Sequence, residues 1–434
     1  MTAAASSSGR PARALARRVL DRVGQESAWA TLSLDAELSR SSLAERDRRL
    51  AAELVYGVLR HRARLDRALA AHADLRRTPP RLVTILRVAA YQLLLLDRIP
   101  AYAAVDDAVE AARGGGGGKL AGFANAVLRK IVSHGEPPPP EEPRARLEAQ
   151  ASLPGWILDE LEAALEDPAE LPAAALALAE QAPLFLRANL RRVQVDELAR
   201  ELEAEGAAAE ILPEPGALRV SKLGEPARSP SFRAGRYTIQ DRSAQAVARL
   251  AAPARGQRIL DACAGVGGKS THLAELTDDA ATIDAVDLSE TKLELLERAA
   301  RRLGHTSIRA HVADLLSPAL AFVGRDYPRI VLDAPCSGLG VLRRHPDAKW
   351  RLGPADLASV AALQASLLDA VFGALAPGGA LVYSVCTFTV REGPAQLRAF
   401  VERHPEMRVL EERRSWPHHD GGDAFYLARL ERQR

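Results

Sequence analysis

The chain has very few cysteines and no long apolar run. Three cysteines in 434 residues are too few for a disulfide framework and lack the paired spacing of a zinc site, so we expect free thiols and no metal. No segment approaches the roughly 20 apolar residues that span a bilayer, and the opening stretch MTAAASSSGRPAR has no apolar run behind its basic residues. These absences predict a cytoplasmic protein without a membrane anchor.

Lysine is also scarce, because only six of the 58 basic residues are lysines. The charge is unevenly distributed. Residues 1–132 hold 22 basic and 13 acidic side chains, a net +9, although the whole chain carries only +2. A basic N-terminal region favours a polyanion as partner. An arginine-rich surface is also common under GC-rich coding bias, so charge alone leaves the partner open.

The pattern of apolar residues divides the chain into regions. Helical spacing throughout residues 1–132 predicts an all-α bundle, interrupted by a loop at the glycine run 114–118. The proline-rich stretch 133–145 predicts a stiff linker. Residues 146–235 mix helical and strand-like pieces, as in a small α+β domain. In residues 236–434, short apolar runs alternate with helical stretches, which is typical of a doubly wound, Rossmann-like α/β sheet.

Acids and cysteines follow five of the strand-like runs in this last region. Ligands of a doubly wound sheet bind beyond the carboxyl ends of its strands, so we expect these side chains to share one edge. A lone interior cysteine is more often a small buried hydrophobe, but all three cysteines of the chain lie there. In chain order, the residues are Asp261 and Cys263, Asp287, Asp314, Asp333 and Cys336, and Cys386.

The first turn, DACAGVGGKS, suggests a phosphate cradle but fits neither common pattern. The first glycine of a P-loop would fall on Cys263, and the third glycine of the dinucleotide fingerprint would fall on Ser270. A glycine turn remains, with Asp287 twenty residues beyond Gly267. An acid there can bind ribose hydroxyls, and Asp314 is placed to reach an adenine amino group. Each acid alone could be a helix N-cap; together they indicate an adenosine ligand without pyrophosphate, such as S-adenosylmethionine.

Two cysteines beside such a site indicate a particular chemistry. A pyrimidine carbon 5 is a poor nucleophile until a thiolate adds to carbon 6, so one cysteine can form the adduct and a second group can assist its collapse. Asp333 could hydrogen-bond the N3 and N4 edge of a cytosine. A thiolate also needs a positive neighbour, and Lys269 is the best candidate.

Several motifs together resemble the Nop/Sun family of RNA cytosine-5 methyltransferases. They are GRYTIQDRSAQAVARL, LDACAGVGGKSTH, DAPCSGLGVLRRHPDAKW, LVYSVCTF and DGGDAFYLARLER. The N-terminal stretches AAELVYGVLR and GFANAVLRK resemble the NusB-like RNA-binding domain of one bacterial branch of the family. The resemblance covers nearly the whole chain and implies 5-methylcytidine formation in small-subunit ribosomal RNA by a monomer that uses S-adenosylmethionine.

The resemblance also assigns roles that spacing alone does not. It implies that Cys386 is the nucleophile, that Cys336 aids release of the adduct, and that Asp333 lies between cofactor and base. It places Arg344, His345 and Lys349 towards the RNA, where a solvated basic loop is the alternative. The cofactor residues that it implies are Cys263, Ala264, Gly265, Val266, Gly267, Gly268, Lys269, Asp287, Asp314 and Asp333.

Three positions depart from the family pattern. The glycine turn reads AGVGGK instead of the usual Ala-Pro-Gly-Gly-Lys, Val385 stands where threonine usually precedes the nucleophile, and Gly393 stands where asparagine is expected after Glu392. We still expect an active enzyme. Two alternatives remain open at this stage: the same chemistry on transfer RNA, and a ribosome assembly factor that binds RNA without catalysis.

Overall fold

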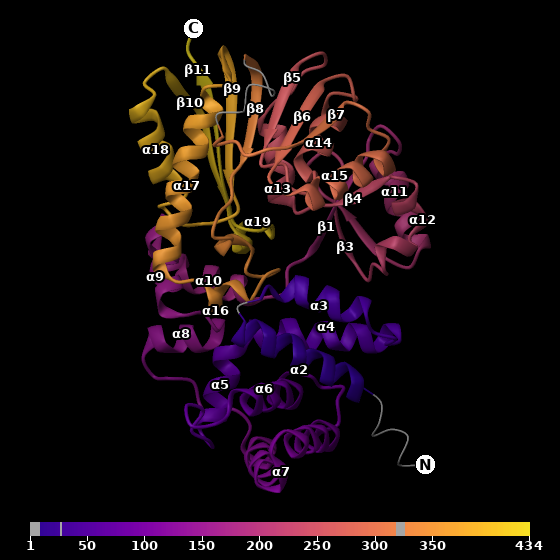
Figure 1. The fold of residues 1–434 in the computed structure, drawn as a ribbon, viewed down its shortest axis with the longest axis vertical. Coiled ribbons are helices and arrows are strands. Elements are labelled where there is room, and N and C mark those ends of the chain that lie inside the picture. Colours follow the sequence, from indigo (N-terminus) through magenta and orange to yellow (C-terminus); the bar gives the residue numbers. More distant parts are fainter. Residues whose placement is uncertain (1–8, 27, 318–325) are drawn as a thin grey trace. The chain divides into compact units, whose positions relative to one another are not determined.

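A computed structural model describes residues 9–26, 28–317 and 326–434. The chain forms two compact units (Figure 1). The first comprises Met1–Glu180 and Leu342–Leu352, and the second comprises Gln181–Val341 and Gly353–Arg434.

The first unit begins with the helical bundle that the apolar spacing predicts. Its core consists of leucine, valine and alanine side chains such as Leu54, Leu86 and Leu128, none of which is exposed. The long helix α7 is broken at Gly116 and Gly117, where the backbone is not helical, so the expected interruption at the glycine run is confirmed. The helices are α2 (Arg10–Gln25), α3 (Ala30–Ser39), α4 (Glu45–Arg60), α5 (Arg62–Ala70), α6 (Pro80–Leu95) and α7 (Ala101–His134).

The same unit continues beyond the proline-rich stretch. The backbone N–H of Ala63 donates to Ser152 Oγ at 2.8 Å, which ties the bundle to the helices that follow. The first compact unit therefore extends past the proline-rich stretch and ends at Glu180, and the linker expected at 133–145 stays a prediction. The remaining helices of the first unit are α8 (Pro143–Ala151), α9 (Gly155–Ala164), η1 (Pro168–Glu170), α10 (Leu171–Ala179) and, from the separate segment, α16 (Ala348–Arg351).

The second unit opens with a small antiparallel sheet in the order β2-β3-β1-β4. The last of its strands contributes the fully buried Tyr237. The small α+β domain expected from the sequence therefore exists, and its last strand runs to Ile239, beyond the expected end at residue 235. Its elements are β1 (Leu184–Ala188), α11 (Val195–Ala204), β2 (Ala208–Ile211), β3 (Ala217–Ser221), η2 (Pro226–Arg228), α12 (Pro230–Arg233) and β4 (Tyr237–Ile239).

A seven-stranded sheet forms the rest of the second unit, in the order β10-β11-β9-β8-β5-β6-β7. The five strands from β9 to β7 pair in parallel, and β11 joins β9 and β10 antiparallel. Its elements are α13 (Arg242–Leu250), β5 (Arg258–Ala262), α14 (Gly268–Leu276), β6 (Thr282–Asp287), α15 (Glu290–Leu303), β7 (Ile308–Val312), β8 (Tyr327–Asp333), η4 (Leu339–Val341), α17 (Pro354–Phe372), β9 (Leu375–Val385), α18 (Pro394–Arg403), β10 (Met407–Ser415), α19 (Pro417–Asp420) and β11 (Phe425–Arg432).

Side chains that alternate along the strands are buried on both faces of this sheet. Ile259 and Val331 face α13 and α14, whereas Leu260 and Leu332 face the layer that contains α17. This two-sided burial confirms the predicted doubly wound architecture. Contrary to the sequence expectation, α17 is long and apolar enough to cross a membrane. Its Leu368, however, is fully buried in the core under the sheet.

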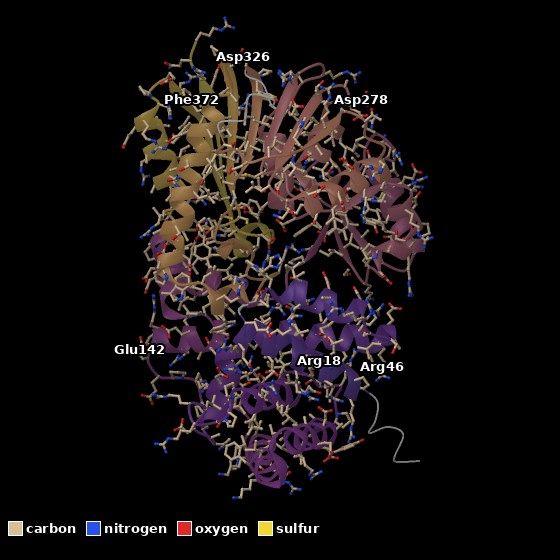
Figure 2. The ribbon with its side chains drawn as sticks, in the orientation of Figure 1. Arg18, Arg46, Glu142, Asp278, Asp326 and Phe372 are labelled. Carbon is tan, nitrogen blue, oxygen red and sulfur yellow. The ribbon has the colours of Figure 1, made fainter. Side chains whose placement is uncertain are left out.

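The strand order reverses beside β5, which pairs in parallel with both β6 and β8. A crevice forms at such a switch point, at the carboxyl ends of the strands, and is where ligands of this fold bind. The opposite edge is marked in Figure 2 by Asp326, which precedes β8, and by Phe372 at the end of α17. The predicted catalytic and cofactor residues end or follow strands at the carboxyl edge, whereas Arg344, His345 and Lys349 belong to the first unit.

Candidate active site at the carboxyl edge of the sheet

The glycine turn connects β5 to α14 through backbone conformations that side chains disfavour. Gly265 and Gly267 have φ values of +55° and +85°, and Cys263 adopts φ +62° despite its side chain. A Cβ atom on Gly267 would lie 2.4 Å from Leu296 Cγ, so glycine is required there. The turn thereby brings backbone close to any ligand above β5 and aims the N-terminus of α14 at the same place.

A pocket of about 420 Å³ adjoins this turn, bounded by Asp287 and Asp314. Asp287 accepts from the N–H of Gly265 at 2.9 Å and from the N–H of Ser289 at 2.9 Å, which fixes its orientation. A carboxylate offers about four acceptor positions, so capacity for ribose hydroxyls remains. The large apolar Leu288, 70% exposed, also lines the pocket. The acids can bind hydroxyl and amino groups, and the apolar wall can pack against a purine. The pocket therefore fits the adenosine part of S-adenosylmethionine.

Lys269 and Asp333 form an ion pair between the glycine turn and the end of β8. Asp333 also accepts from Ser384 Oγ at 2.7 Å, so both of its oxygens are held. Burial alone would lower the pKa of Lys269, but the charge and hydrogen bond of Asp333 outweigh it and raise that pKa, with a smaller contribution from Cys386. The ammonium therefore stays charged within reach of the Cys386 sulfur, as the sequence predicted for a thiolate partner.

The two motif cysteines meet at this edge. The sulfurs of Cys336 and Cys386 lie 3.0 Å apart, and both are free thiols. The hydrogen bond to Cys386, together with burial, raises the pKa of the Cys336 thiol well above its usual value. Burial and nearby acids, Asp287 first among them, raise the pKa of Cys263 to about 12. Cys336 and Cys263 are therefore neutral thiols, and Cys336 can donate a proton to its neighbour.

A buried carboxylate that the sequence did not identify links the two cysteine loops. Glu392 is fully buried and accepts from Ser337 N at 2.8 Å, Ser337 Oγ at 2.6 Å and Thr389 Oγ1 at 2.9 Å. Gln364 Nε2 of α17 donates to it at 3.1 Å. Ser337 follows Cys336 directly, so Glu392 fixes the Pro-Cys loop against the loop that carries Cys386. The Glu that survives in the second motif was visible in the sequence, but its burial was not.

Arg187 of the small sheet supports the glycine turn from below. It is 1% exposed and forms a two-pronged ion pair with Glu275 of α14, at 2.7 and 2.9 Å. Its guanidinium also donates to the backbone oxygen of Gly268 at 2.9 Å. No motif pointed to this residue, because the contact joins elements 81 positions apart. The small domain and the cofactor turn are therefore one rigid assembly.

The three residues expected to face RNA divide between surface and interior. Lys349 is 2% exposed, and its Nζ donates to the backbone oxygen of Arg60 at 2.6 Å. Burial first, and then the charge of Arg60, lowers the pKa of Lys349 well below its usual value. This corrects the prediction that Lys349 presents a charge to RNA. His345 lies half-buried against Thr31, whereas Arg344 retains partial exposure.

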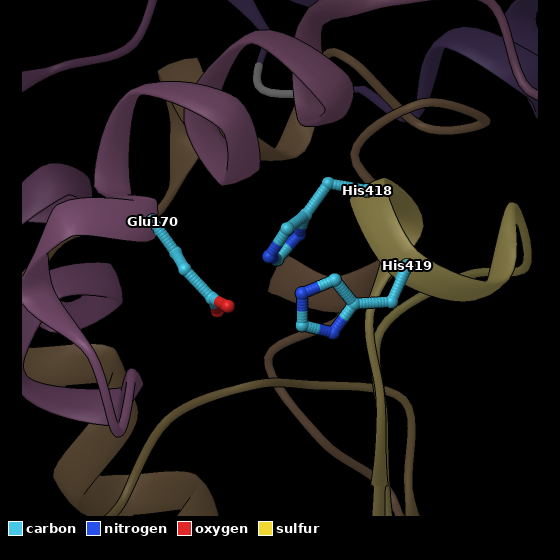
Figure 3. A group of neighbouring side chains, drawn as sticks. All are labelled: Glu170, His418 and His419. Atoms are coloured by element: carbon cyan, nitrogen blue, oxygen red, sulfur yellow. The ribbon is translucent and has the colours of Figure 1, made fainter.

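The nearest approach to a metal-binding group in the second unit is a pair of histidines. His418 and His419 are adjacent on α19, with ring centroids 4.1 Å apart (Figure 3). Glu170, also drawn there, belongs to the first unit. Two imidazoles are fewer than the three or four protein ligands of a zinc site.

The fold and site define a class. A doubly wound sheet, a glycine turn and acids after β6 and β7 that bound an adenosine-sized pocket are the architecture of an S-adenosylmethionine-dependent methyltransferase.

Comparisons with known proteins identify the family. A family model described as 16S rRNA methyltransferase RsmB/F matches residues 248–431, a NusB family model matches residues 10–133, and a ferredoxin-like domain model of RsmF/B-like methyltransferases matches residues 153–224. The chain is 34% identical to the probable ribosomal RNA small subunit methyltransferase B of Bacillus subtilis, over 97% of this chain and 98% of that protein. It is also 34% identical to the ribosomal RNA small subunit methyltransferase B of Erwinia tasmaniensis, over 97% and 98%. The chain belongs to the ribosomal RNA small subunit methyltransferase B family.

Solved structures agree on the fold. The structure of PH0851 superposes with a TM-score of 0.82 at 22% identity and covers 98% of this chain and 99% of that one. NSun6 from Pyrococcus horikoshii superposes with a TM-score of 0.57 at 20% identity, over 68% of this chain and 98% of that one. The predicted NusB-like bundle, small middle domain and methyltransferase domain are thereby confirmed.

Proposed function

We propose that this protein transfers a methyl group from S-adenosylmethionine to carbon 5 of a cytidine in small-subunit ribosomal RNA. The observation that carries the proposal is the pair of cysteine sulfurs, 3.0 Å apart at the carboxyl edge of a methyltransferase sheet. A methyltransferase that acts on a nitrogen or oxygen needs no thiol, whereas carbon 5 of a pyrimidine needs covalent activation. The names of the relatives supply the RNA class.

The residues of the site divide the work of this reaction. Cys386 adds to carbon 6 of the cytosine, which makes carbon 5 nucleophilic. The glycine turn, Asp287 and Asp314 would hold S-adenosylmethionine, which would supply the methyl group as a sulfonium. Water takes the proton from carbon 5, the electron pair of that C–H bond re-forms the double bond between carbons 5 and 6, and the bond between sulfur and carbon 6 breaks with return of its electron pair to Cys386. Asp333 hydrogen-bonds the N3 and N4 edge as charge develops there, while Lys269 remains its counter-ion.

The roles of the two cysteines follow from their surroundings. The raised pKa of the Cys336 thiol makes it a poor nucleophile near neutral pH. Cys386 has the charged ammonium of Lys269 within electrostatic reach. We therefore assign the covalent adduct to Cys386 and its release to Cys336.

The RNA partner also accounts for features outside the catalytic sheet. The net +9 of residues 1–132 lies on the part of the chain that matches the NusB family, and a positive surface attracts a phosphate backbone. Arg344 remains a candidate for RNA contact. We further propose that the protein acts in the cytoplasm, where ribosomal RNA is assembled, and as a monomer, because its site is complete within one chain.

The decisive experiment uses the cysteine pair. Cys336→Ala is purified under denaturing conditions from cells, and covalently attached RNA is sequenced. We expect an adduct that disappears in the Cys336→Ala, Cys386→Ala double variant, and a fragment of small-subunit ribosomal RNA in the sequence. If the attached RNA is transfer RNA, the proposed substrate is wrong, but the proposed cysteine-adduct chemistry still holds.

Absence of an adduct is also informative. If Cys336→Ala still folds and binds S-adenosylmethionine but yields no adduct, the Cys386→Ala variant is tested in the same way. An adduct in that variant would make Cys336 the nucleophile and overturn our assignment. No adduct in either, together with no 5-methylcytidine formed by the wild type, would favour an assembly factor without catalysis.

A further inference from the structure

A second cavity, outside the cofactor pocket, lies within the second unit. It has a volume of about 350 Å³ and is bounded by α13 on one side and by β10 and β11 on the other. Alternate residues of a strand share a face, so Arg429 lies on the same face of β11 as Phe425 and Leu427. Phe425 and Leu427 pack with residues of α13. The cavity therefore lies on the α13 face of the sheet.

Arginine dominates the wall of this cavity. Arg242 and Arg249 come from α13, Arg413 and Arg414 come from β10, and Arg429 comes from β11. Three acids line the same cavity. Glu214 accepts from Arg242 at 2.8 Å through one oxygen, while its other oxygen has no hydrogen-bond partner among the described residues; Glu411 pairs with Arg413; the third is Asp420.

Of the five lining arginines, Arg249 and Arg429 have no ion pair among the described residues. Arg249 has a single hydrogen bond, a long one of 3.5 Å to Gln245 Oε1, and it forms no ion pair among the described residues. Arg429 lies opposite Glu411 across the strands, but that carboxylate is held by Arg413, and Arg429 Nε has no hydrogen-bond partner in the described part of the chain. Both side chains are half-buried. Partly desolvated guanidinium groups with free donors bind phosphate in a two-pronged manner.

The cavity also reaches the catalytic edge. Ser415 lines it at the end of β10 and pairs with Phe425. The next residue of β11, Tyr426, pairs with Val385, which directly precedes Cys386. A nucleic-acid strand whose target base lies at Cys386 can therefore continue over this end of the sheet into the cavity.

We infer that the cavity between α13 and the β10–β11 strands binds backbone phosphates of the substrate RNA through Arg249 and Arg429. This inference rests on the proposed function, since it takes the substrate to be RNA. It adds an RNA contact on the catalytic unit that none of the sequence motifs indicated. The site positions the strand beside the target cytidine and takes no part in methyl transfer.

The test uses the full chain with Arg249→Ala and Arg429→Ala combined. The matched control combines Arg200→Ala on α11 with Arg298→Ala on α15, two well-exposed arginines of the same unit that pair with acids on their own helices. The dissociation constant for 16S ribosomal RNA transcribed in vitro is measured over a range of salt concentrations. Binding of S-adenosylmethionine is measured by calorimetry, and kcat at saturating RNA.

We expect the dissociation constant of the cavity variant to rise at least about tenfold. The slope of the logarithm of the binding constant against the logarithm of the salt concentration should become shallower by about 1.4. Each contact with a phosphate of a single strand contributes about 0.7 to this slope. Affinity for S-adenosylmethionine and kcat at saturation should match the wild type, and the control variant should bind RNA as the wild type does. If the double alanine variant fails to fold, Arg249→Lys with Arg429→Lys retains both charges and should still weaken binding severalfold.

Two results would overturn the inference. One is a folded cavity variant with the affinity and salt slope of the wild type. The other is normal binding to naked RNA with a loss confined to partly assembled subunits, which would indicate a ribosomal protein as the occupant. Failure of the proposed function would look different, since the wild type itself would then form no 5-methylcytidine, whereas the effect of the variant on RNA affinity could still be measured.

Discussion

Two lysines from motif segments have opposite environments in the structure. Lys269, after the glycine turn, forms an ion pair with Asp333, and that carboxylate raises its pKa against the effect of burial. Lys349, in the segment that follows the Pro-Cys motif, donates to the backbone oxygen of Arg60 and lies against the ring of Trp350, and burial lowers its pKa. Burial acts in the same direction on both, so the partner decides which one stays charged.

The presence of a lysine in a family motif does not by itself show whether that lysine is charged in the folded protein. Both residues lie in stretches that resemble the family, and the sequence predicts a charged function for each. Lys269 is charged because Asp333, at the end of another strand, pairs with it. Lys349 instead packs inside the first unit. A buried side chain stays charged when a partner of opposite charge or a hydrogen-bond network stabilises it, and that partner is usually distant in the sequence.

The largest effect is expected when Lys269 loses its carboxylate partner and is left buried without one, as Lys349 is. Asp333→Asn removes the carboxylate and leaves the burial. We expect kcat to fall at least about 10²-fold, because a hydrogen bond to the developing charge on the base is lost. The pKa of Lys269 should fall as well, so the alkaline limb of the pH–rate profile should move to lower pH. Steady-state kinetics between about pH 6 and pH 10 measure both.

Asp369→Asn is the matched control for this variant, since Asp369 pairs with Arg403 near the protein surface. Its kcat and pH profile should equal those of the wild type. An Asp333→Asn enzyme with unchanged kcat would remove Asp333 and Lys269 from the proposed mechanism.

Glu392 extends the comparison to a buried negative charge. It forms no ion pair in the described part of the chain and accepts from four neutral N–H and O–H donors instead. Glu392→Gln replaces one acceptor oxygen by a donor that faces other donors. We expect the free energy of unfolding of the second unit to fall by about 1–3 kcal/mol, and kcat to fall about tenfold as the cysteine loops shift. Affinity for S-adenosylmethionine should not change.

Urea denaturation and calorimetry test these expectations for Glu392. Glu402→Gln, an exposed residue of α18, serves as control and should leave both quantities unaltered. Wild-type activity in Glu392→Gln would show that the network stabilises the fold without positioning the cysteines.

The smallest effect is expected for Lys349→Met. The wild-type lysine has its pKa lowered on folding, so the unfolded chain binds more protons than the folded one at pH values between the folded-state pKa and the unfolded pKa of about 10.4. The stability of the first unit should therefore rise with pH towards about 10, and fall as pH decreases. Methionine removes the titrating group, so this slope should be reduced, and activity at neutral pH should be kept.

The tryptophan fluorescence of the first unit, which contains Trp29, Trp156 and Trp350, reports its unfolding at each pH. An unchanged slope in Lys349→Met would mean that the ammonium is not desolvated as described. A loss of RNA binding in this variant would restore the original prediction that Lys349 faces RNA.

Much of the fold could be predicted because it depends on short-range patterns. Helical spacing identified the N-terminal bundle, and the alternation of short apolar runs with helices identified the doubly wound sheet. The end of the first unit could not be predicted, because it depends on how α8 packs against α5, and no local signal in the proline-rich stretch reports that contact.

The sequence by itself determined the edge at which the chemistry takes place. Parallel strands end on a common edge, so acids and cysteines that follow successive strands must gather there whatever the details of packing. Only the tertiary structure decided which of them meet: that Cys336 touches Cys386, that Asp333 neutralises Lys269, that Glu392 joins two loops, and that Lys349 is buried. Each of these depends on distances of a few ångströms between side chains from different strands and helices, which composition and spacing do not specify.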